Sequence, residues 1–416
     1  MDADLPRTVE TVVVGAGHAG LTMSWFLREA GREHVVLDRR EQLGGGWQDR
    51  WDGFRLVSPN WTTALPGFDY DGTDPDGFMP RDEVVDRMRR YAAAIDAPVR
   101  LGTTVRRLRA ADSGAHPFRL ETDAGTIDAR DVIVATGAFH APRIPAVSGG
   151  ISPRVRQVHS QDYRRPSDLP PGRVLVVGTG QTGVQLAEEL RDVGREVILS
   201  VGHCGRAPRR YRGRDTFWWL RRLAEESAAG RRGLPSVDQL PDPRGRLAGN
   251  PHMSGHGGGH DTNLRKFAAD GVRLVGRLDG ADGERVRFAP GLEANLEFAD
   301  AFFDDRFRPL CEALIERTGL DLPPDDREPF AHTVPEVSEL DLAAEGVSAV
   351  LWTSGYGFDF GWIDLPIFDE MGFPRTTRGV SAVPGLSFIG TLWQFNLGSA
   401  NLVGVALDAR HLAEQW

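Results

Sequence analysis

Cysteine is almost absent from this chain of 416 residues. The only two cysteines, Cys204 and Cys311, lie far apart in the sequence and form no Cys-x-x-Cys. A disulfide framework, a zinc site and a dithiol redox centre all need paired or clustered cysteines. The sequence therefore disfavours all three as the basis of function.

Excess positive charge and long apolar runs are also lacking. The formal net charge is −10, which argues against a nucleic-acid partner or a polybasic membrane surface. No stretch reaches the ~18 apolar residues of a membrane span, and the N-terminal residues form no basic-then-apolar leader. We expect a cytoplasmic protein without an integral membrane segment.

Lysine is equally scarce, because Lys266 is the only lysine among 49 basic residues. The rest are arginines, which indicates a compositional bias and makes any single arginine a weak sign of function. The hydrophobic content of 40% and the charged content of 26% are typical of soluble globular proteins. The length is sufficient for two or three domains.

A strand–glycine turn–helix–strand pattern occurs twice. "TVVVGAGHAG" (11–20) runs into a helical pattern and then the strand "HVVLD" (34–38), and "RVLVVGTGQTG" (173–183) repeats the order up to "EVILS" (196–200). The runs "DVIVATG" and "AVLWTSG" each look like the strand that closes its own unit. The sequence predicts an α/β fold with two Rossmann-like dinucleotide-binding domains.

The first turn has the features of a site for a nucleotide with a free ribose. Gly15, Gly17 and Gly20 have the G-x-G-x-x-G spacing, and Asp38 ends the next strand about 20 residues further on. A carboxylate there accepts hydrogen bonds from a ribose 2′-hydroxyl and repels a 2′-phosphate. The segment "EQLGGGWQDRW" (41–51) favours FAD over NAD, since three glycines allow close approach of a large planar ligand. A loop that packs a core tryptophan is the alternative.

The predicted FAD site also draws on other segments. Its residues are Gly15, Gly17, Gly20, Asp38, Arg39, Gly45, Trp47, Thr136, Gly137, Gly390, Gly398, Ser399 and Asn401.

The second turn lacks the acid. Its second strand ends in Ser200 and is followed by several arginines, which together favour a 2′-phosphate and hence NADPH over NADH. Composition alone could also account for each arginine. The predicted NADPH site comprises Gly178, Gly180, Gln181, Thr182, Gly183, Ser200, Arg206, Arg209 and Arg210.

One site for FAD and one for NADPH predict a hydride relay from the pyridine nucleotide through the flavin. We assign residues 1–165 and 356–416 to a discontinuous FAD-binding domain, and residues 166–355 to an NADPH-binding domain with an insertion at about 213–265. A further helix is expected over 294–318, with Cys311 on its buried side. The electron acceptor stays open among O₂, a small molecule and a protein carrier.

The two fingerprints, "VATG" (134–137) and "VHSQDYRRP" (158–166) together resemble the class B flavin-dependent monooxygenases over nearly the whole chain. The family signature is Phe-x-Gly-x-x-x-His-x-x-x-(Tyr/Trp). The chain keeps His159 and Tyr163 but has Pro153 and Val155 where Phe and Gly belong. Tyr163 in place of Trp favours a heteroatom oxygenase over a Baeyer–Villiger enzyme. The resemblance gives His159 a role in domain coupling; a plain structural histidine is the alternative.

The resemblance implies that reduced flavin reacts with O₂ to form a C4a-(hydro)peroxide, which NADP⁺ shields from water. The protonated form transfers oxygen to an amine or sulfide. Asn60, within "LVSPNWTTALPGF", is the candidate for holding the peroxide, and an asparagine in a turn after Pro59 is the alternative. In related flavoproteins a C-terminal helix, here expected to begin near Ser399, points its N-terminus at the flavin pyrimidine.

Two further features have several interpretations. His256 and His260 flank three glycines, which favours a mobile loop over the NADPH site and disfavours a metal site. Trp218 and Trp219 could belong to a substrate pocket, a subunit contact or the core. Whether the chain forms a homodimer is left open.

The leading function is therefore an NADPH- and O₂-dependent FAD monooxygenase acting on a small organic molecule, with N- or S-oxygenation favoured. Baeyer–Villiger or oxidative-decarboxylating oxygenation is the alternative within the class. An electron-transfer reductase and a nucleotide-sensing regulatory flavoprotein are the alternatives outside it.

Overall fold

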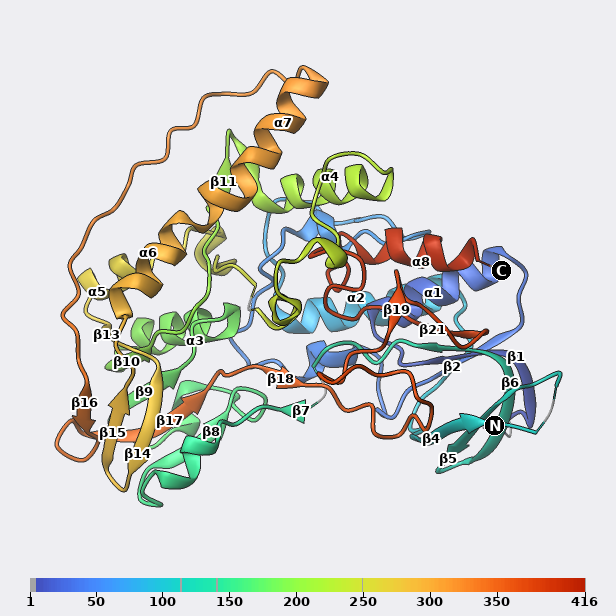
Figure 1. Cartoon of the computed structure of the whole chain (residues 1–416), viewed down its shortest axis with the longest axis horizontal. Helices are drawn as coiled ribbons and strands as arrows, with labels where there is room; N and C mark the ends of the chain where they lie inside the picture. The colour runs from blue at the N-terminus through green and yellow to red at the C-terminus, as the bar shows by residue number, and fades with distance from the viewer. Residues whose placement is uncertain (1–4, 113, 140, 249, 416) are drawn as a thin grey trace.

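The computed structural model describes residues 5–112, 114–139, 141–248 and 250–415. Two mainly parallel sheets lie in separate halves of the molecule, each with helices packed against it (Figure 1). Among the described residues, no helix combines the length and apolarity that a bilayer crossing requires.

The first sheet is built around five parallel strands in the order β21-β6-β1-β2-β3. An antiparallel extension, β4 and β5, pairs with β6, and β19 and β20 continue the other edge. The strands are β1 (Thr8–Val14), β2 (His34–Leu37), β3 (Val99–Arg100), β4 (Val105–Ala110), β5 (Phe118–Thr122), β6 (Gly125–Val134), β19 (Thr376–Thr377), β20 (Val380–Ser381) and β21 (Leu386–Phe388).

Alternation along β1 decides what covers each face of this sheet. Val13 packs under three helices, α1 (His18–Glu29), α2 (Arg81–Ala94) and α8 (Val405–Ala413). Val12 and Val14 pack on the opposite face, with residues of β4–β6 and of the segment 358–368. β-Branched residues suit such a strand, which is buried on both faces.

The second sheet has five strands in the order β13-β10-β9-β17-β8, all parallel. Helices α3 and α5 cover one face, and a small antiparallel sheet of β14, β15 and β16 covers the other. The elements are β8 (Arg156–His159), β9 (Arg173–Val177), α3 (Gln181–Asp192), β10 (Val197–Ser200), α5 (Leu264–Ala269), β13 (Arg273–Val275), β14 (Leu278–Asp282), β15 (Arg285–Phe288), β16 (Glu339–Asp341) and β17 (Val347–Trp352).

The domain boundary predicted at residue 165 is wrong, because β8 pairs with β17 and so belongs to the second sheet. The chain passes from one domain to the other twice. These two connecting segments lie side by side, where β7 (Ala141–Pro142) pairs with β18 (Tyr356–Gly357). A strand of only four residues that follows a proline- and glycine-rich stretch carries little sequence signal of which sheet it joins.

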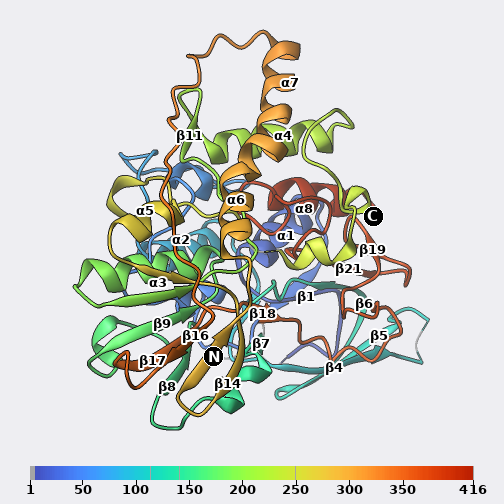
Figure 2. The same ribbon diagram turned by 60° about the vertical axis from the view of Figure 1, so that its left-hand side comes forward.

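A helical arm projects from the second domain (Figure 2). It consists of β11 (Arg210–Tyr211), β12 (Arg214–Asp215), α4 (Thr216–Ala228), α6 (Leu292–Phe302), a π-helical turn (Phe303–Phe307) and α7 (Arg308–Thr318). The helix expected over 294–318 is thus interrupted, and Cys311 is fully buried in it. Trp219 is buried in the same cluster and donates its Nε1–H to the Tyr211 carbonyl at 3.0 Å, so it is a core residue.

The C-terminal helix begins at Val405 rather than near Ser399. Side-chain bonds organise the preceding turns, because the Ser399 hydroxyl accepts the N–H groups of Phe395 and Asn396 at 3.0 and 3.2 Å. The Asn396 side chain likewise accepts the Gly398 N–H at 2.8 Å. Such local bonds compete with helical backbone pairing and delay the helix start.

Candidate dinucleotide sites

The glycine turn after β1 has room for a ligand at one position only. Gly15 has φ +111°, and a Cβ there would lie 2.5 Å from the Ala135 carbonyl oxygen. A Cβ on Gly20 would lie 1.8 Å from the Gly15 carbonyl oxygen. By contrast, a Cβ on Gly17 would meet only the Cα of Gly45, at 4.0 Å. The first and third glycines therefore close the turn, and the second leaves an opening at the N-terminus of α1 that fits a pyrophosphate.

The turn after β9 repeats this geometry. A Cβ on Gly178 (φ +112°) would lie 2.8 Å from the Thr353 carbonyl oxygen, and one on Gly183 would lie 2.0 Å from that of Gly178. Gly180 has no described atom within 4 Å of its Cβ position. Gly17 and Gly180 are also the N-cap residues of α1 and α3, so no side chain competes there for the first helical N–H groups. Both turns fit a dinucleotide pyrophosphate.

Asp38 links the end of β2 to the first turn. Its carboxylate accepts the Ala16 N–H at 2.7 Å and the Arg40 N–H at 2.9 Å, and the residue is buried. The carboxylate therefore lies next to the turn, where the fingerprint requires it. Arg39, the following residue, is exposed. The contact of Asp38 with a ribose stays a prediction.

The three-glycine loop lies directly on the first turn. A Cβ on Gly45 would come within 2.9 Å of the Gly17 Cα. The loop continues into a 3₁₀ turn (Gly45–Asp49) that contains the half-buried Trp47. The close approach explains why glycine is needed at this position and supports a flavin site there.

His18 is a residue of this site that sequence reasoning missed. Its ring centroid lies 6.4 Å from that of Trp47, and the ring lies next to the backbone of Ala400 in the C-terminal segment. Burial lowers the pKa of His18 to about 4, so the ring is neutral at physiological pH. The only sequence signal was its position inside the glycine fingerprint, between Gly17 and Gly20.

The other predicted FAD residues lie at the ends of neighbouring strands. Thr136 and Gly137 follow β6, and Gly390 follows β21 with its Cβ position 2.7 Å from the Ala19 Cβ. Ser399 is buried in the turns before α8, and the Asn401 amide donates to the Leu397 carbonyl at 3.0 Å. The carboxyl ends of β1, β6 and β21 meet at one edge of the sheet, so these segments converge on the first turn.

Asn60 is buried and its side chain holds a neighbouring loop. Its Oδ1 accepts the Met79 N–H at 2.7 Å, and its Nδ2 donates to the Asp74 carbonyl at 2.9 Å. A primary amide carries a second N–H, which leaves one donor for another partner. The predicted contact of Asn60 with an oxygenated flavin stays a prediction.

At the second turn, the structure separates the predicted residues. Gln181 begins α3, and Thr182 follows it at the opening beside Gly180. Ser200 is buried and turned away from solvent, since its hydroxyl donates to the Gly276 carbonyl at 2.9 Å and accepts the Leu278 N–H at 3.0 Å.

The three predicted arginines differ in availability. Arg206 pairs with Asp300 at 2.7 Å. Arg209 is buried, pairs with Asp215 at 2.6 Å and donates to the Val57 carbonyl at 2.6 Å. Arg210 is exposed. Two of the three guanidiniums thus already have a carboxylate partner, which weakens their assignment to a 2′-phosphate.

His159 is the last residue of β8 and contacts the segment that connects β17 to the first domain. Its Nε2 bonds to the Gly355 carbonyl at 3.1 Å, and its Nδ1 accepts the Gln161 N–H at 3.1 Å. The ring also contacts Tyr356 edge-on at 5.2 Å. Burial lowers the pKa of His159, consistent with the neutral tautomer that these bonds require. Its role in domain coupling stays a prediction.

Both cysteines are unsuited to redox chemistry. Cys204 and Cys311 are free and buried, and burial raises the pKa of each thiol to about 12. A thiolate, which disulfide exchange needs, is therefore strongly disfavoured at both positions. Among the described residues there is also no cluster of histidine, cysteine and carboxylate groups able to hold a metal ion.

Two dinucleotide turns on two parallel sheets define a two-dinucleotide oxidoreductase fold. Residues 12–226, just over half of the chain, match the family described as pyridine nucleotide-disulphide oxidoreductase. A Geobacillus kaustophilus protein described as an uncharacterized oxidoreductase, CzcO-like, is 30% identical over 410 residues, which is 98% of each chain. The chain belongs to the pyridine nucleotide-disulphide oxidoreductase family.

Other similarities are to named monooxygenases. The rice indole-3-pyruvate monooxygenase YUCCA1 is 31% identical over 209 residues, which is 50% of this chain and 51% of that protein. The structure of a flavin-containing monooxygenase from Stenotrophomonas maltophilia superimposes with a TM-score of 0.63 at 21% identity, covering 99% of this chain and 98% of that one. The predicted fold class, the resemblance to flavin monooxygenases and the prediction of an oxidoreductase are confirmed.

Proposed function

We propose that the protein is an NADPH- and O₂-dependent FAD monooxygenase that oxygenates a small organic substrate, with amines and sulfides favoured over ketones. The observation that carries the proposal is the pair of glycine turns, each open only at its middle glycine. The turns differ at the ribose position, where the first has Asp38 and the second has Ser200. This difference supports FAD at the first turn and NADPH at the second.

The residues that hold FAD come from several segments. The N–H groups at the start of α1 face the opening at Gly17, and Asp38 lies beside the turn to accept a ribose hydroxyl. Gly45 lets the loop lie close to the turn, and neutral His18 adds a polar group between that loop and the C-terminal segment. FAD held there would supply a hydride acceptor for NADPH and the reactivity toward O₂.

Two observations favour O₂ over a disulfide as the acceptor of the electrons. A disulfide substrate would need a reactive thiol in this chain, and burial suppresses both thiolates. Similar proteins include a rat dimethylaniline monooxygenase that forms N-oxides, and similar solved structures include an S-allyl-L-cysteine S-oxygenase from Allium sativum. Tyr163, which replaces tryptophan in the signature, supports oxygenation of nitrogen or sulfur.

The decisive experiment follows the fate of O₂. Purified protein, NADPH and ¹⁸O₂ are incubated with panels of amines, sulfides, ketones and 2-oxo acids, and products are resolved by mass spectrometry. We expect one ¹⁸O atom in the product of an amine or sulfide, with NADPH oxidised faster than NADH. If NADPH oxidation yields only hydrogen peroxide with every panel, or electrons pass to a ferredoxin-like carrier without oxygenated product, the monooxygenase proposal is wrong.

A further inference from the structure

A segment distant in sequence lies along α3 and contacts it from Gln181 to Asp192. Residues 250–261, here called the strap, contain His252, Ser254, His256 and His260. The strap holds the first residue of that helix, since Gln181 donates its amide to the Met253 carbonyl and accepts the Met253 N–H at 3.2 Å. Gln181 follows Gly180 directly, so the strap is bonded to the turn that would bind the pyrophosphate.

The strap also contacts the loop that follows β10. The Ala207 N–H donates to the His252 carbonyl at 3.2 Å, and the His252 N–H donates to the Gly205 carbonyl at 2.9 Å. The His252 side chain is fully buried and lies next to the backbone of Thr179. One segment therefore joins both parts of the protein that the NADPH site requires, namely the glycine turn and the ribose-side loop.

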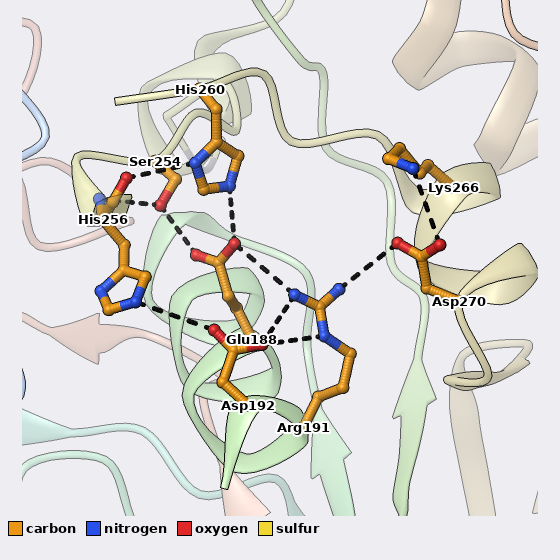
Figure 3. Close-up of polar contacts among 8 residues, drawn as sticks. All are labelled: Glu188, Arg191, Asp192, Ser254, His256, His260, Lys266 and Asp270. Carbon is orange, nitrogen blue, oxygen red and sulfur yellow. Dashed lines mark hydrogen bonds and ion pairs between the residues drawn. The ribbon is translucent and has the colours of Figure 1, made fainter. Parts of the chain in front are cut away.

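Glu188, about two turns after Gln181 on α3, anchors the strap (Figure 3). Its carboxylate accepts the Ser254 hydroxyl at 2.8 Å and lies 2.6 Å from the His260 Nε2. Glu188 is only 4% exposed. A buried carboxylate that accepts two bonds from the same segment gives that segment one defined position.

The His260 ring makes two bonds, both to acceptors. Its Nε2 faces Glu188, and its Nδ1 lies 3.2 Å from the His256 carbonyl oxygen. A neutral imidazole has a single N–H and can donate to only one of them, whereas an imidazolium donates to both. Deprotonation of His260 therefore costs the strap one of its bonds.

The other charged groups near Glu188 and His260 form ion pairs with one another. On α3, Arg191 lies 4.0 Å from Glu188 and 2.8 Å from Asp192, and it reaches Asp270 at the end of α5 at 3.7 Å. Asp270 also pairs with Lys266 at 3.6 Å. His256 lies 3.7 Å from Asp192 and is mostly exposed (Figure 3). At the end of the strap, the Asp261 carboxylate accepts the backbone N–H of Arg209.

We propose that Glu188 is a positioning residue of the pyridine-nucleotide site: through Ser254 and His260 it holds the strap on Gln181, and nucleotide affinity therefore depends on the protonation of His260. The inference rests on the proposed function for the assignment of NADPH to this turn. It adds a role for residues that do not themselves touch the nucleotide.

The direction of the pH effect follows from the pair. The hydrogen bond with Glu188 raises the pKa of His260, and the bonds from His260 and Ser254 lower the pKa of Glu188 against the opposing effect of burial. Both groups are thus ionised between the lowered pKa of Glu188 and the raised pKa of His260. Affinity is highest in that window and falls as the pH rises through the folded-state pKa of His260.

The test measures NADP⁺ and NAD⁺ binding to the full-length, FAD-loaded protein by calorimetry, at about pH 6 and about pH 8.5. NAD⁺ is included because the 2′-phosphate of NADP⁺ itself titrates near pH 6. For the unsubstituted protein, we expect both affinities to fall about three- to tenfold at the higher pH, the effect of one lost hydrogen bond. Hydrogen exchange of the strap should rise in parallel.

Three variants separate positioning from a general structural role. Glu188→Ala should weaken both nucleotides at both pH values and speed exchange in the strap. His260→Gln, which cannot be protonated, should bind at the high-pH level throughout. Glu188→Gln keeps an acceptor for Ser254, so it should retain intermediate affinity with a flattened pH profile. His411→Gln, on α8, is the matched histidine control and should behave like the unsubstituted protein.

Wild-type affinity and an unchanged pH profile in both Glu188→Gln and His260→Gln would overturn the inference while leaving the proposed function intact. Retention of FAD in each variant shows that a loss of affinity is not a loss of folding. If the unsubstituted protein binds neither nucleotide at either pH, the proposed function and the nucleotide role of the strap fail together. Strap exchange then still reports whether Glu188 holds the strap in place.

Discussion

The three glycines of each turn have two different roles: the first and third allow the turn to fold, and the middle one leaves space for a ligand. The first and third glycines of each turn are required by the protein itself, because a Cβ would collide with the backbone. The middle glycines, Gly17 and Gly180, are not, because no described atom lies closer than 4.0 Å to their Cβ positions. We infer that only the ligand requires glycine at these two positions.

Gly180→Ala should therefore weaken NADP⁺ binding at least about tenfold, since the methyl group would occupy the place of a phosphate. The thermal stability and FAD content should not change, because Gly180 has φ −69°, which alanine adopts freely. Calorimetry and the flavin absorption spectrum measure the two quantities. Gly17→Ala is the corresponding substitution at the first turn, and it should lower FAD occupancy instead. Equal NADP⁺ affinity in Gly180→Ala and the unsubstituted protein would refute a phosphate at this turn.

At the residue scale, sequence reasoning identified positions more securely than contacts. The spacing located Asp38 beside the first turn correctly. It could not show that Ser200 faces the backbone where β13 leads into β14 or that Asn60 holds a loop, because such partners are distant in sequence. Side-chain orientation depends on neighbours that only the folded chain provides.

Helix α3 belongs to the second domain and also contacts the first. Its N-terminus forms the second glycine turn, its Glu188 holds the strap, and its next residue, Glu189, faces the first domain. A Cβ on Gly53 of that domain would lie 2.8 Å from the Glu189 carboxylate. Burial raises the pKa of Glu189 to about 7, with a smaller contribution from the charge of Asp52.

This raised pKa predicts a pH-dependent penalty at the domain contact. The folded protein keeps the proton of Glu189 up to about pH 7, while the unfolded chain releases it near the ordinary value of 4.5. The contribution of Glu189 to wild-type stability therefore decreases as the pH rises from 4.5 to about 7 and stays lower above it. Glu189→Gln should raise the free energy of unfolding by about 1–3 kcal/mol at about pH 8 and change it little at about pH 4.

Thermal and urea unfolding at both pH values measure the difference. The exposed Glu29 at the end of α1 supplies the matched substitution, Glu29→Gln, for which no such difference is expected. A gain in Glu189→Gln that is equal at both pH values would contradict a buried, protonated carboxyl group.

Contacts between the two domains give Arg209 a different role from the one that the sequence suggested. Sequence position suggested a 2′-phosphate ligand, whereas the buried guanidinium bonds to Asp215 in its own domain and to the Val57 carbonyl in the other. It also lies 5.0 Å from the centre of the Phe78 ring. These contacts make Arg209 a connection between the two domains.

Arg209→Met keeps much of the apolar volume but removes these bonds. We expect it to lower the free energy of unfolding by about 3–5 kcal/mol, the cost of breaking a buried ion pair. The ratio of NADP⁺ to NAD⁺ affinity should remain unchanged, because the guanidinium is already occupied. Differential scanning calorimetry and binding titrations measure the two quantities. Exposed Arg210→Met is the stability control. A loss of nucleotide selectivity with normal stability in Arg209→Met would restore the phosphate assignment.

The sequence by itself determined the two dinucleotide units, because a buried strand, a glycine turn and a helix are encoded locally by spacing and residue type. It also determined that the units differ, since Asp38 and Ser200 occupy equivalent positions. Only the tertiary structure decided that β8 joins the second sheet, that α8 begins at Val405 and that the strap lies on α3. These features depend on contacts between segments far apart in the chain, which periodicity and composition do not record.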